Sequence, residues 1–444
     1  MAKTRRDKMF SWMKILFGWQ LLILADVCLS LSPSMAQTNT ENFAQFKFNF
    51  NNPGARATGV GGAFISIADD ATAAEANPAG LAAVIRPEIS FETKGIKFKT
   101  HVNNFSHTEN GADYSIIGRD FENSVVSPSF ASAALPFQNL TFSAFRYELV
   151  NFKSAFFTKG SFVSPLKDGT AFRPISSTAE LRIVNWGGAI ASKFSEYFSI
   201  GVSLGLSRID MKSSLTRYNL EVFDESTVSS VATIDDSQND LFFNIGLIVR
   251  PLENLSLGAI YKKRPEFGLQ QTFRFTDFPA DSVSVKRINF KVPSSLGFGV
   301  SYRPIDVLTL SFDAVRITYS RLTEDFVLTF SEESVGKDDF VVDDGMEYHA
   351  GAEYVLLLQS FGIVFRGGFY IEPDNRIRWA GKPTNDPNKV FDRQVMEALF
   401  QAGETNFHTT FGLGLVVSDN FQFDVAGNLS TGSDEIVGSF VVRF

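Results

Sequence analysis

Apolar residues recur at every second position in many segments of this chain, with small or polar residues between them. In the segment 198–207, apolar side chains run from Phe198 to Leu206, and each position between them holds serine or glycine. The same alternation appears in four further segments: 255–262, 296–302, 346–356 and 421–430. Because successive side chains of a strand point to opposite faces, the pattern predicts strands with one apolar face and one small or polar face.

The connections between these segments alternate in length. Six short turns lie at 136–139, 194–196, 251–254, 303–306, 358–360 and 418–420. Long polar loops separate them, apart from a short last connection at 431–434. Fourteen strands fit around the turns, with expected spans 88–101, 125–135, 139–150, 178–193, 197–212, 239–250, 254–275, 285–303, 307–330, 341–357, 361–372, 407–417, 421–430 and 434–444. An even strand number, with short turns at one end and long loops at the other, is typical of bacterial outer-membrane barrels.

A soluble β-sandwich would also alternate, because one face of each of its sheets packs on a core. The segments found here are closer to the roughly ten residues of a tilted membrane strand than to the five or six that are usual in soluble sheets. The last alternating segment, which ends in Phe444, resembles the assembly signal of outer-membrane barrels. The sequence therefore predicts an all-β fold, a fourteen-stranded antiparallel transmembrane β-barrel over residues 88–444.

The first residues follow a different pattern. Five basic residues and an apolar run, 15–24, precede the small residues that end at Ala36. This order predicts a secretory signal peptide, residues 1–36, cleaved after Ala36. Cleavage removes five basic and two acidic side chains and takes the formal net charge from −8 to −11, which argues against nucleic-acid binding. The only cysteine, Cys28, lies in this segment, so the mature chain is expected to have no thiol chemistry.

Residues 37–87 do not alternate. They are rich in glycine and alanine, which allow tight turns and close approach of the backbone. Asp69 and Asp70 precede an alanine-rich run that predicts one short helix, capped by an aspartate and ended by Asn77 and Pro78. Such a segment is too small to fold alone, and a barrel of about fourteen strands is wider than its own side chains can fill. We therefore expect residues 37–87 to plug the barrel as a hatch.

The hatch segment carries the most specific motifs of the chain. Gly59 to Phe64, Ala68 to Ala71 and Asn77 to Ala79 resemble the FadL/TodX family of outer-membrane transporters for long-chain fatty acids and aromatic hydrocarbons. Weaker resemblance continues to Gly368. It implies a fourteen-stranded barrel with an N-terminal hatch and a ligand that leaves sideways. The hatch and gating residues implied by the resemblance are Gly59, Gly61, Gly62, Asp69, Asp70, Asn77, Pro78 and Ala79.

The third expected strand, 139–150, contains a break in its alternation. Apolar residues occupy even positions from Leu140 to Ala144 and odd positions from Phe145 onward, as a bulge would cause. We predict a kink at Ala144 and Phe145. The resemblance implies that the Asn77 motif of the hatch lies near an inward kink of this strand.

Candidate polar residues inside the barrel come from two neighbouring strands. Glu347, His349 and Glu353 share one face of the tenth expected strand, and Arg366 lies on the next. The four histidines of the chain lack the spacing and the cysteine partners of a metal site. We therefore expect these residues to line the lumen, with no enzyme activity, no cofactor and no metal; a lipase-like barrel is the enzymatic alternative.

These features predict a channel of the bacterial outer membrane for passive uptake of hydrophobic small molecules, such as long-chain fatty acids or aromatic hydrocarbons. The expected partners are the hydrophobic ligand and outer-membrane lipid. The alternative is a carrier or scaffold resembling the PorV-like barrels of type IX secretion, which bind exported proteins. A water-filled porin fits less well, because the expected hatch would obstruct a wide channel.

Overall fold

A computed structural model describes the greater part of the chain. The described residues are 50–102, 105–109, 112–116, 119–158, 175–218, 228–276, 282–326, 337–381, 400, 402–418 and 420–444. The predicted signal peptide, residues 1–36, and the first residues of the expected hatch, 37–49, lie outside them.

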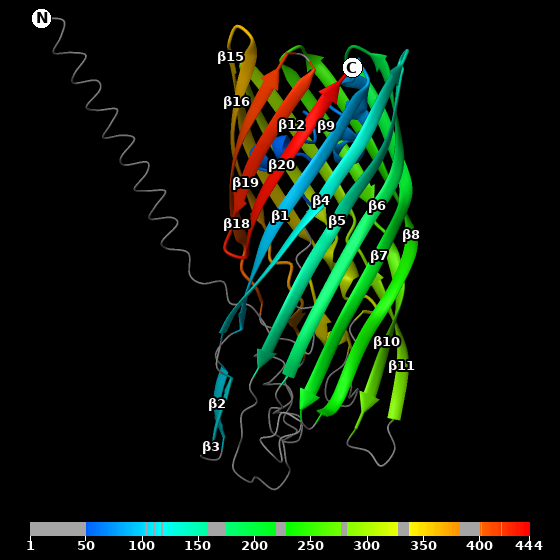
Figure 1. Ribbon diagram of the computed structural model, residues 1–444, viewed down its shortest axis with the longest axis vertical. Coiled ribbons are helices and arrows are strands. Elements are labelled where there is room, and N and C mark those ends of the chain that lie inside the picture. The colour runs from blue at the N-terminus through cyan, green and yellow to red at the C-terminus, as the bar shows by residue number, and fades with distance from the viewer. Residues whose placement is uncertain are drawn as a thin grey trace, which may run out of the picture. The chain divides into compact units, whose positions relative to one another are not determined.

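The described strands form one closed antiparallel sheet (Figure 1). Its members are β1 (Glu88–Val102), β4 (Arg119–Phe137), β5 (Leu140–Thr158), β6 (Ile175–Ser195), β7 (Phe198–Tyr218), β8 (Val228–Leu252), β9 (Leu255–Lys263), β10 (Glu266–Phe275), β11 (Ser282–Lys291), β12 (Ser295–Ile305), β13 (Leu308–Ile317), β15 (Gly345–Leu357), β16 (Phe361–Glu372), β18 (Asn406–Val417), β19 (Phe421–Leu429) and β20 (Ser433–Arg443). Because β9 with β10 and β11 with β12 are each one interrupted strand, the wall has fourteen strands, and the predicted barrel is confirmed. Pairing of β1 with β20 and of β8 with β9 closes it.

The remaining elements are short. The described hatch residues form α2 (Ala55–Gly59), α3 (Ala73–Ala76) and the 3₁₀ turn η1 (Pro78–Ala83). Outside the barrel sheet lie β2 (Phe105–Glu109) with β3 (Ala112–Ile116), β14 (Phe340–Val341) with β17 (Arg378–Trp379), and the 3₁₀ turns η2 (Tyr319–Leu322) and η3 (Lys337–Asp339). No helix in the part of the chain that the structure describes is long and apolar enough to cross a membrane.

The apolar face of the strands points outward near the short turns. On β7, Leu204 and Leu206 are more than half exposed, whereas Ser203 and Ser207 on either side of them are buried inside the barrel. The same outward band of leucine, valine and phenylalanine continues over β12, β16, β18 and β19. An apolar exterior around a small and polar interior is the arrangement that suits a wall surrounded by lipid.

Toward the long-loop end the arrangement reverses. Farther along β7, Arg208 and Lys212 face outward, while Ile209 and Met211 are buried inside. The interior side chains at this level belong to one apolar cluster with the hatch; we call them the upper lumen, comprising Phe152, Leu181, Ile183, Ile209, Met211, Ile234, Phe267, Leu269, Ile288 and Phe290. The wall therefore extends beyond the apolar band, with a charged exterior and an apolar interior.

Two expected strands are interrupted, and a third ends early. The seventh and eighth, 254–275 and 285–303, are each interrupted, and prolines at 265 and 293 stand at the two breaks. Proline has no N–H to donate to the sheet, which explains both interruptions. The ninth was predicted over 307–330, but β13 ends at Ile317 and the chain turns into η2, whose Tyr319 and Leu322 are buried.

The described hatch lies inside the barrel at the end that carries the short turns and the C-terminus (Figure 1). The predicted helix is present as α3, but Thr72 rather than an aspartate takes the N-cap position. Barrel side chains bind the hatch backbone on several sides. Asp313 of β13 accepts the N–H groups of Phe64 and Ile65 at 2.7 and 2.8 Å, and Ser132 of β4 donates to the Ala71 carbonyl at 2.8 Å.

Glycines of the wall let the hatch approach the strands closely. A Cβ at Gly246 of β8 would lie 1.9 Å from Oδ1 of Asn77, and one at Gly351 of β15 would lie 2.2 Å from the Val60 carbonyl oxygen. Neither position has room for a side chain. The small residues that alternate with apolar ones in the sequence are therefore required where the wall meets the hatch.

Substituting one of these glycines tests the contact. Gly246→Ala forces Asn77 or the strand to move, and overpacking of this kind typically costs about 1–3 kcal/mol of stability. Gly438→Ala is the matched control, since a Cβ there would have nothing within 4 Å. We expect Gly246→Ala alone to lower the unfolding midpoint of the purified barrel in denaturant. Equal midpoints for the two variants would contradict the close contact.

Candidate functional site

Asn77 joins the hatch to the barrel wall. Its side chain is fully buried, and Nδ2 donates to the Ile65 carbonyl at 2.9 Å and to the Leu247 carbonyl of β8 at 3.3 Å. Oδ1 accepts the N–H of Ala79 at 3.2 Å, which caps η1. Pro78 follows at the first position of η1, where a missing N–H costs nothing. Asn77 and Pro78 thus end α3 and begin η1.

The motif packs on β7 and β8, while η1, which it begins, also contacts β5. Pro78 packs on Gly201 of β7, and Asn77 on Gly246 of β8. The expected neighbour was a kink in the third strand, which is β5.

The predicted hatch glycines occupy positions that a larger residue could not. Gly61 and Gly62 have φ angles of 67° and 77°, in the left-handed region that favours glycine. A Cβ on Gly61 would lie 2.8 Å from the Ala350 carbonyl oxygen, and one on Gly62 would lie 2.8 Å from Nδ1 of His349. Gly59 is the last residue of α2 and is buried.

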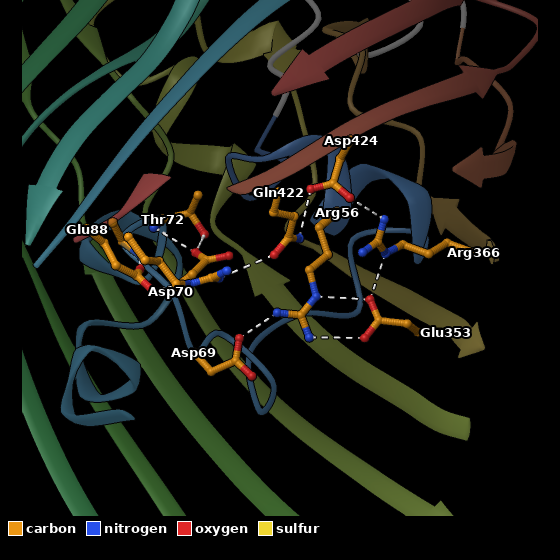
Figure 2. Close-up of polar contacts among 11 residues, drawn as sticks. Arg56, Asp69, Asp70, Thr72, Glu88, Glu353, Arg366, Gln422 and Asp424 are labelled. Carbon is orange, nitrogen blue, oxygen red and sulfur yellow. Dashed lines mark hydrogen bonds and ion pairs between the residues drawn. The ribbon is translucent and has the colours of Figure 1, made fainter. Parts of the chain in front are cut away.

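A chain of ion pairs ties the hatch to the wall (Figure 2). Arg56 of α2 pairs with Asp69 within the hatch and, at 3.0 Å from Nε, with Glu353 of β15. Arg366 of β16 bridges Glu353 and Asp424 of β19, each at 2.6 Å. Glu353, Arg366 and Asp424 are all less than 10% exposed. Two cations and three carboxylates therefore alternate from the hatch across three strands.

The electrostatics of the hatch follow from this burial. Burial lowers the pKa of Arg56, but the carboxylates of Asp69 and Glu353 outweigh it and raise that pKa well above its usual value. For Asp70, burial has the larger effect and raises its pKa, although Arg56 opposes the shift. Asp70 also accepts the N–H of Thr72 at 2.8 Å, so it stabilises the turn before α3.

The other predicted lumen residues form a polar cluster above Gly61. Nδ1 of His349 lies 2.7 Å from the Gly61 carbonyl oxygen, so it must carry the proton, and Nε2 lies 3.2 Å from Glu347. The ring of Tyr370 stacks between His349 and His408, with centroid distances of 4.9 and 4.0 Å. Like Glu353 and Arg366, Glu347 and His349 point into the barrel and are buried.

The predicted kink at Ala144 and Phe145 is wrong in position. Both residues are regularly paired with β4 and β6, and the register of β5 shifts between Glu148 and Val150. Phe145 faces inward, 6.1 Å from the ring of Phe242. The change in apolar phase at 144–145 therefore reflects packing inside the barrel, and the bulge itself lies about four residues farther along.

Next to this bulge the barrel wall lacks backbone pairing. β4 and β5 pair from Phe137 with Leu140 to Phe130 with Tyr147, and no farther within the described residues 119–158. Both strands continue, β4 paired with β1 and β5 paired with β6. We call the facing edges, 119–129 and 148–158, the wall gap.

A small cavity lies behind the wall gap. Its volume is about 60 Å³, and it is lined by both edges of the gap, by the N-terminal hatch residues Phe50 and Asn51, and by the cluster around Tyr370 and His408. The cavity therefore connects the gap with the hatch.

A second buried charged cluster lies between α3 and the wall. Glu75 is fully buried and accepts from Arg264 at 2.9 Å and from Asn244 at 3.1 Å, while Nζ of Lys262 lies 3.5 Å away. Nε and Nη1 of Arg264 are buried without a hydrogen-bond partner among the described residues. Two cations, Arg264 and Lys262, thus face one carboxylate, and Arg264 has hydrogen-bond donors that this carboxylate does not use.

The sequence of the chain decides its family. The family of outer membrane protein transport proteins (OMPP1/FadL/TodX) matches residues 37–374. The chain belongs to this family. No curated protein sequence matches it.

Solved structures share the fold of this OMPP1/FadL/TodX barrel. The CymD monoaromatic hydrocarbon channel is 14% identical, with a TM-score of 0.57, over 90% of this chain and 99% of its own. The toluene transporter TbuX of Ralstonia pickettii is 15% identical, with a TM-score of 0.55, over 89% and 99%. A FadL homologue of Pseudomonas aeruginosa is 12% identical, with a TM-score of 0.61, over 90% and 99%. At these identities the likeness establishes the fold.

Five residues of the charged clusters and the wall gap were not predicted from the sequence: Arg56, Glu75, Glu148, Arg264 and Asp424. Three of them interrupt apolar or small-residue stretches with a charge, a signal that could have marked Glu75, Glu148 and Asp424. In the part of the chain that is described, no group of three or more histidine, cysteine or acidic residues could hold a metal ion.

The ion-pair chain predicts a stability effect. Glu353→Gln leaves Arg56 and Arg366 without their shared carboxylate, and breaking a buried pair costs about 3 kcal/mol. Glu180→Gln is the control, because both side chains of its pair with Lys153, at 2.7 Å, are at least half exposed and the pair contributes less than about 1 kcal/mol. Limited proteolysis should cut the hatch faster in Glu353→Gln only. Wild-type cleavage rates in that variant would show that the pairs do not anchor the hatch.

Proposed function

We propose that this barrel mediates passive uptake of hydrophobic small molecules, such as long-chain fatty acids or aromatic hydrocarbons, across the bacterial outer membrane. Family membership supports transport of hydrophobic compounds. The observation that carries the proposal is the reversed polarity of the wall: the part beyond the apolar band is charged outside and apolar inside.

The apolar interior offers a ligand a place to leave water. The side chains of the upper lumen form one cluster that continues to Phe64 and Leu81 of the hatch and to Leu149 and Val150 at the bulge of β5. Burial of apolar surface contributes about 25 cal/mol per Å², so an acyl chain or aromatic ring entering from the long-loop end would be held there.

The wall gap is the proposed exit. The ion pairs and close glycine contacts anchor the hatch, and straight passage past it would require breaking them. The gap lies beside the ligand path and begins at the level where the outward apolar band of the wall ends. A molecule that leaves through it would reach lipid without crossing the periplasm-facing end, and its concentration gradient would drive the transfer.

Arg264 supports an amphiphilic carboxylate among the ligands. Its Nε and Nη1 nitrogens are buried without a hydrogen-bond partner among the described residues, and buried donors without partners are costly. A fatty-acid carboxylate would satisfy them through charge-assisted hydrogen bonds, which toluene cannot do.

Uptake by cells tests the function directly. Cells expressing the barrel should take up labelled oleate or labelled toluene faster than cells without it. Removal of residues 53–82, or replacement of Asn77, should change the rate. If a properly inserted barrel gives no uptake above background for either compound, the proposal fails; a secreted protein that co-purifies without lipid would then favour a carrier.

The role of Arg264 predicts a difference between ligands. Arg264→Met removes the donors while Glu75 keeps Asn244 and Lys262, and a lost charge-assisted hydrogen bond corresponds to roughly tenfold weaker binding or more. We expect the variant to bind oleate about tenfold more weakly and toluene unchanged, measured on purified barrel. An equal loss for both ligands would indicate general damage, and no loss would remove the carboxylate site.

A further inference from the structure

We infer that side chains hold the wall gap shut, and that opening this closure around Glu148 controls lateral release. The inference rests on the proposed function, because it assigns a control point to the proposed exit. It concerns five residues that we call the Glu148 clasp: Ser127, Arg146, Glu148, Asn151 and Arg182.

The clasp replaces the missing backbone ladder. The carboxylate of Glu148 accepts from Ser127 of β4 across the gap, and from Asn151 on its own strand at 3.0 Å. Nδ2 of Asn151 also lies 3.2 Å from Oγ of Ser127. Arg146 donates to the carbonyl of Pro128, again from β5 to β4. Three side-chain contacts therefore join β4 and β5 beyond their last backbone pair, Phe130 with Tyr147.

Two arginines hold Glu148 in place. Nε of Arg182 on β6 lies 2.8 Å from Oε2, and Nη2 of Arg146 lies 3.2 Å from the same oxygen. Glu148 is only 7% exposed, and the carboxylate is fully occupied by donors. Glu148 is therefore a positioning residue that joins β4, β5 and β6.

The sequence explains why the ladder stops here. Pro128 has no N–H, and its carbonyl points toward β5, where Arg146 reaches it. Within a sheet, proline is confined to positions where no donor is needed, such as an edge. On the facing strand, the bulge at Leu149 displaces the backbone from register. Each edge thus carries its own obstacle to pairing.

The closed clasp is too tight for a ligand. The cavity behind it measures about 60 Å³, whereas an apolar cavity that admits benzene in another protein measures about 150 Å³. Toward the long-loop end, Phe121 and Phe156 lie 6.4 Å apart across the same edges, and Phe152 of β5 lies 5.2 Å from Phe98 of β1. Passage therefore requires the edges to separate, which breaks the contacts of Ser127 with Glu148 and Asn151 and that of Arg146 with the Pro128 carbonyl.

A reversible cross-link tests the inference within one protein. Ser127→Cys with Asn151→Cys places one cysteine on each edge of the gap, in a chain whose only natural cysteine is Cys28. A short reducible bifunctional reagent then joins the two edges. Ala133→Cys with Ala144→Cys is the matched control, because these residues are directly paired on the same two strands, outside the gap.

The cross-link should block release without blocking capture. We expect at least a tenfold slower uptake of labelled oleate in cells when the gap is cross-linked, full recovery after reduction, and no effect in the control pair. The purified cross-linked barrel should bind oleate as tightly as the same barrel after the cross-link has been cleaved. The inference is overturned if fully cross-linked protein takes up oleate as fast as the same protein after the cross-link has been cleaved. Absence of uptake in the unmodified barrel overturns the proposed function instead.

Loosening the clasp supplies the opposite test. Glu148→Ala removes all four contacts to the carboxylate, and we expect uptake to rise by about twofold or more. Glu180→Gln, an exposed charge on β6 facing β5, serves as the control and should leave uptake unchanged. Slower uptake in Glu148→Ala, with wild-type stability of the barrel, contradicts a closing role.

Discussion

Backbone hydrogen bonding is the constraint on which the rest of this molecule depends. In lipid, each unpaired N–H or C=O group costs several kcal/mol, so a sheet has to close on itself. The pairing of β1 with β20 and of β8 with β9 meets that requirement. Once the wall is closed, its interior is too wide for its own side chains, and the hatch fills it. At the wall gap, the side chain of Arg146 takes the place of a backbone partner for the carbonyl of Pro128.

Much of the barrel could be predicted because alternation depends on local sequence alone. The alternation of apolar and polar residues marked each short turn and the strands at the level of the apolar band. The same alternation continued on both sides of every turn. The polarity reversal on β7 was harder to interpret, because alternation persists when the apolar face changes from outside to inside after Ser207. The predicted spans therefore stopped short at the long-loop end: β5 and β7 were ended too early, and β6 and β8 were started too late.

The site was less predictable, because its contacts join residues far apart in the chain. The partners of Arg56 lie at positions 69 and 353, and no local pattern links them. The predicted kink shows the same difficulty. At Phe145 and Tyr147 the apolar residues change from even to odd positions, which suggested a bulge, but both side chains simply face inward. They are apolar because they pack on Phe130 and Phe242. Sequence alternation cannot separate a change in backbone register from a change in what lies inside.

The same contacts decide which part of the molecule can move at least cost. Release past the hatch would expose buried ion pairs and withdraw backbone from glycine-lined strands, and breaking even one such pair costs several kcal/mol. Separation of β4 from β5 above Phe130 breaks no backbone pair, since none is present there among the described residues. It breaks a few side-chain hydrogen bonds, each of which contributes about 1 kcal/mol net, or about 1.5–3 when one partner is charged. The wall beside Glu148 can therefore open at lower cost than the hatch can be displaced, and it lies next to the apolar interior.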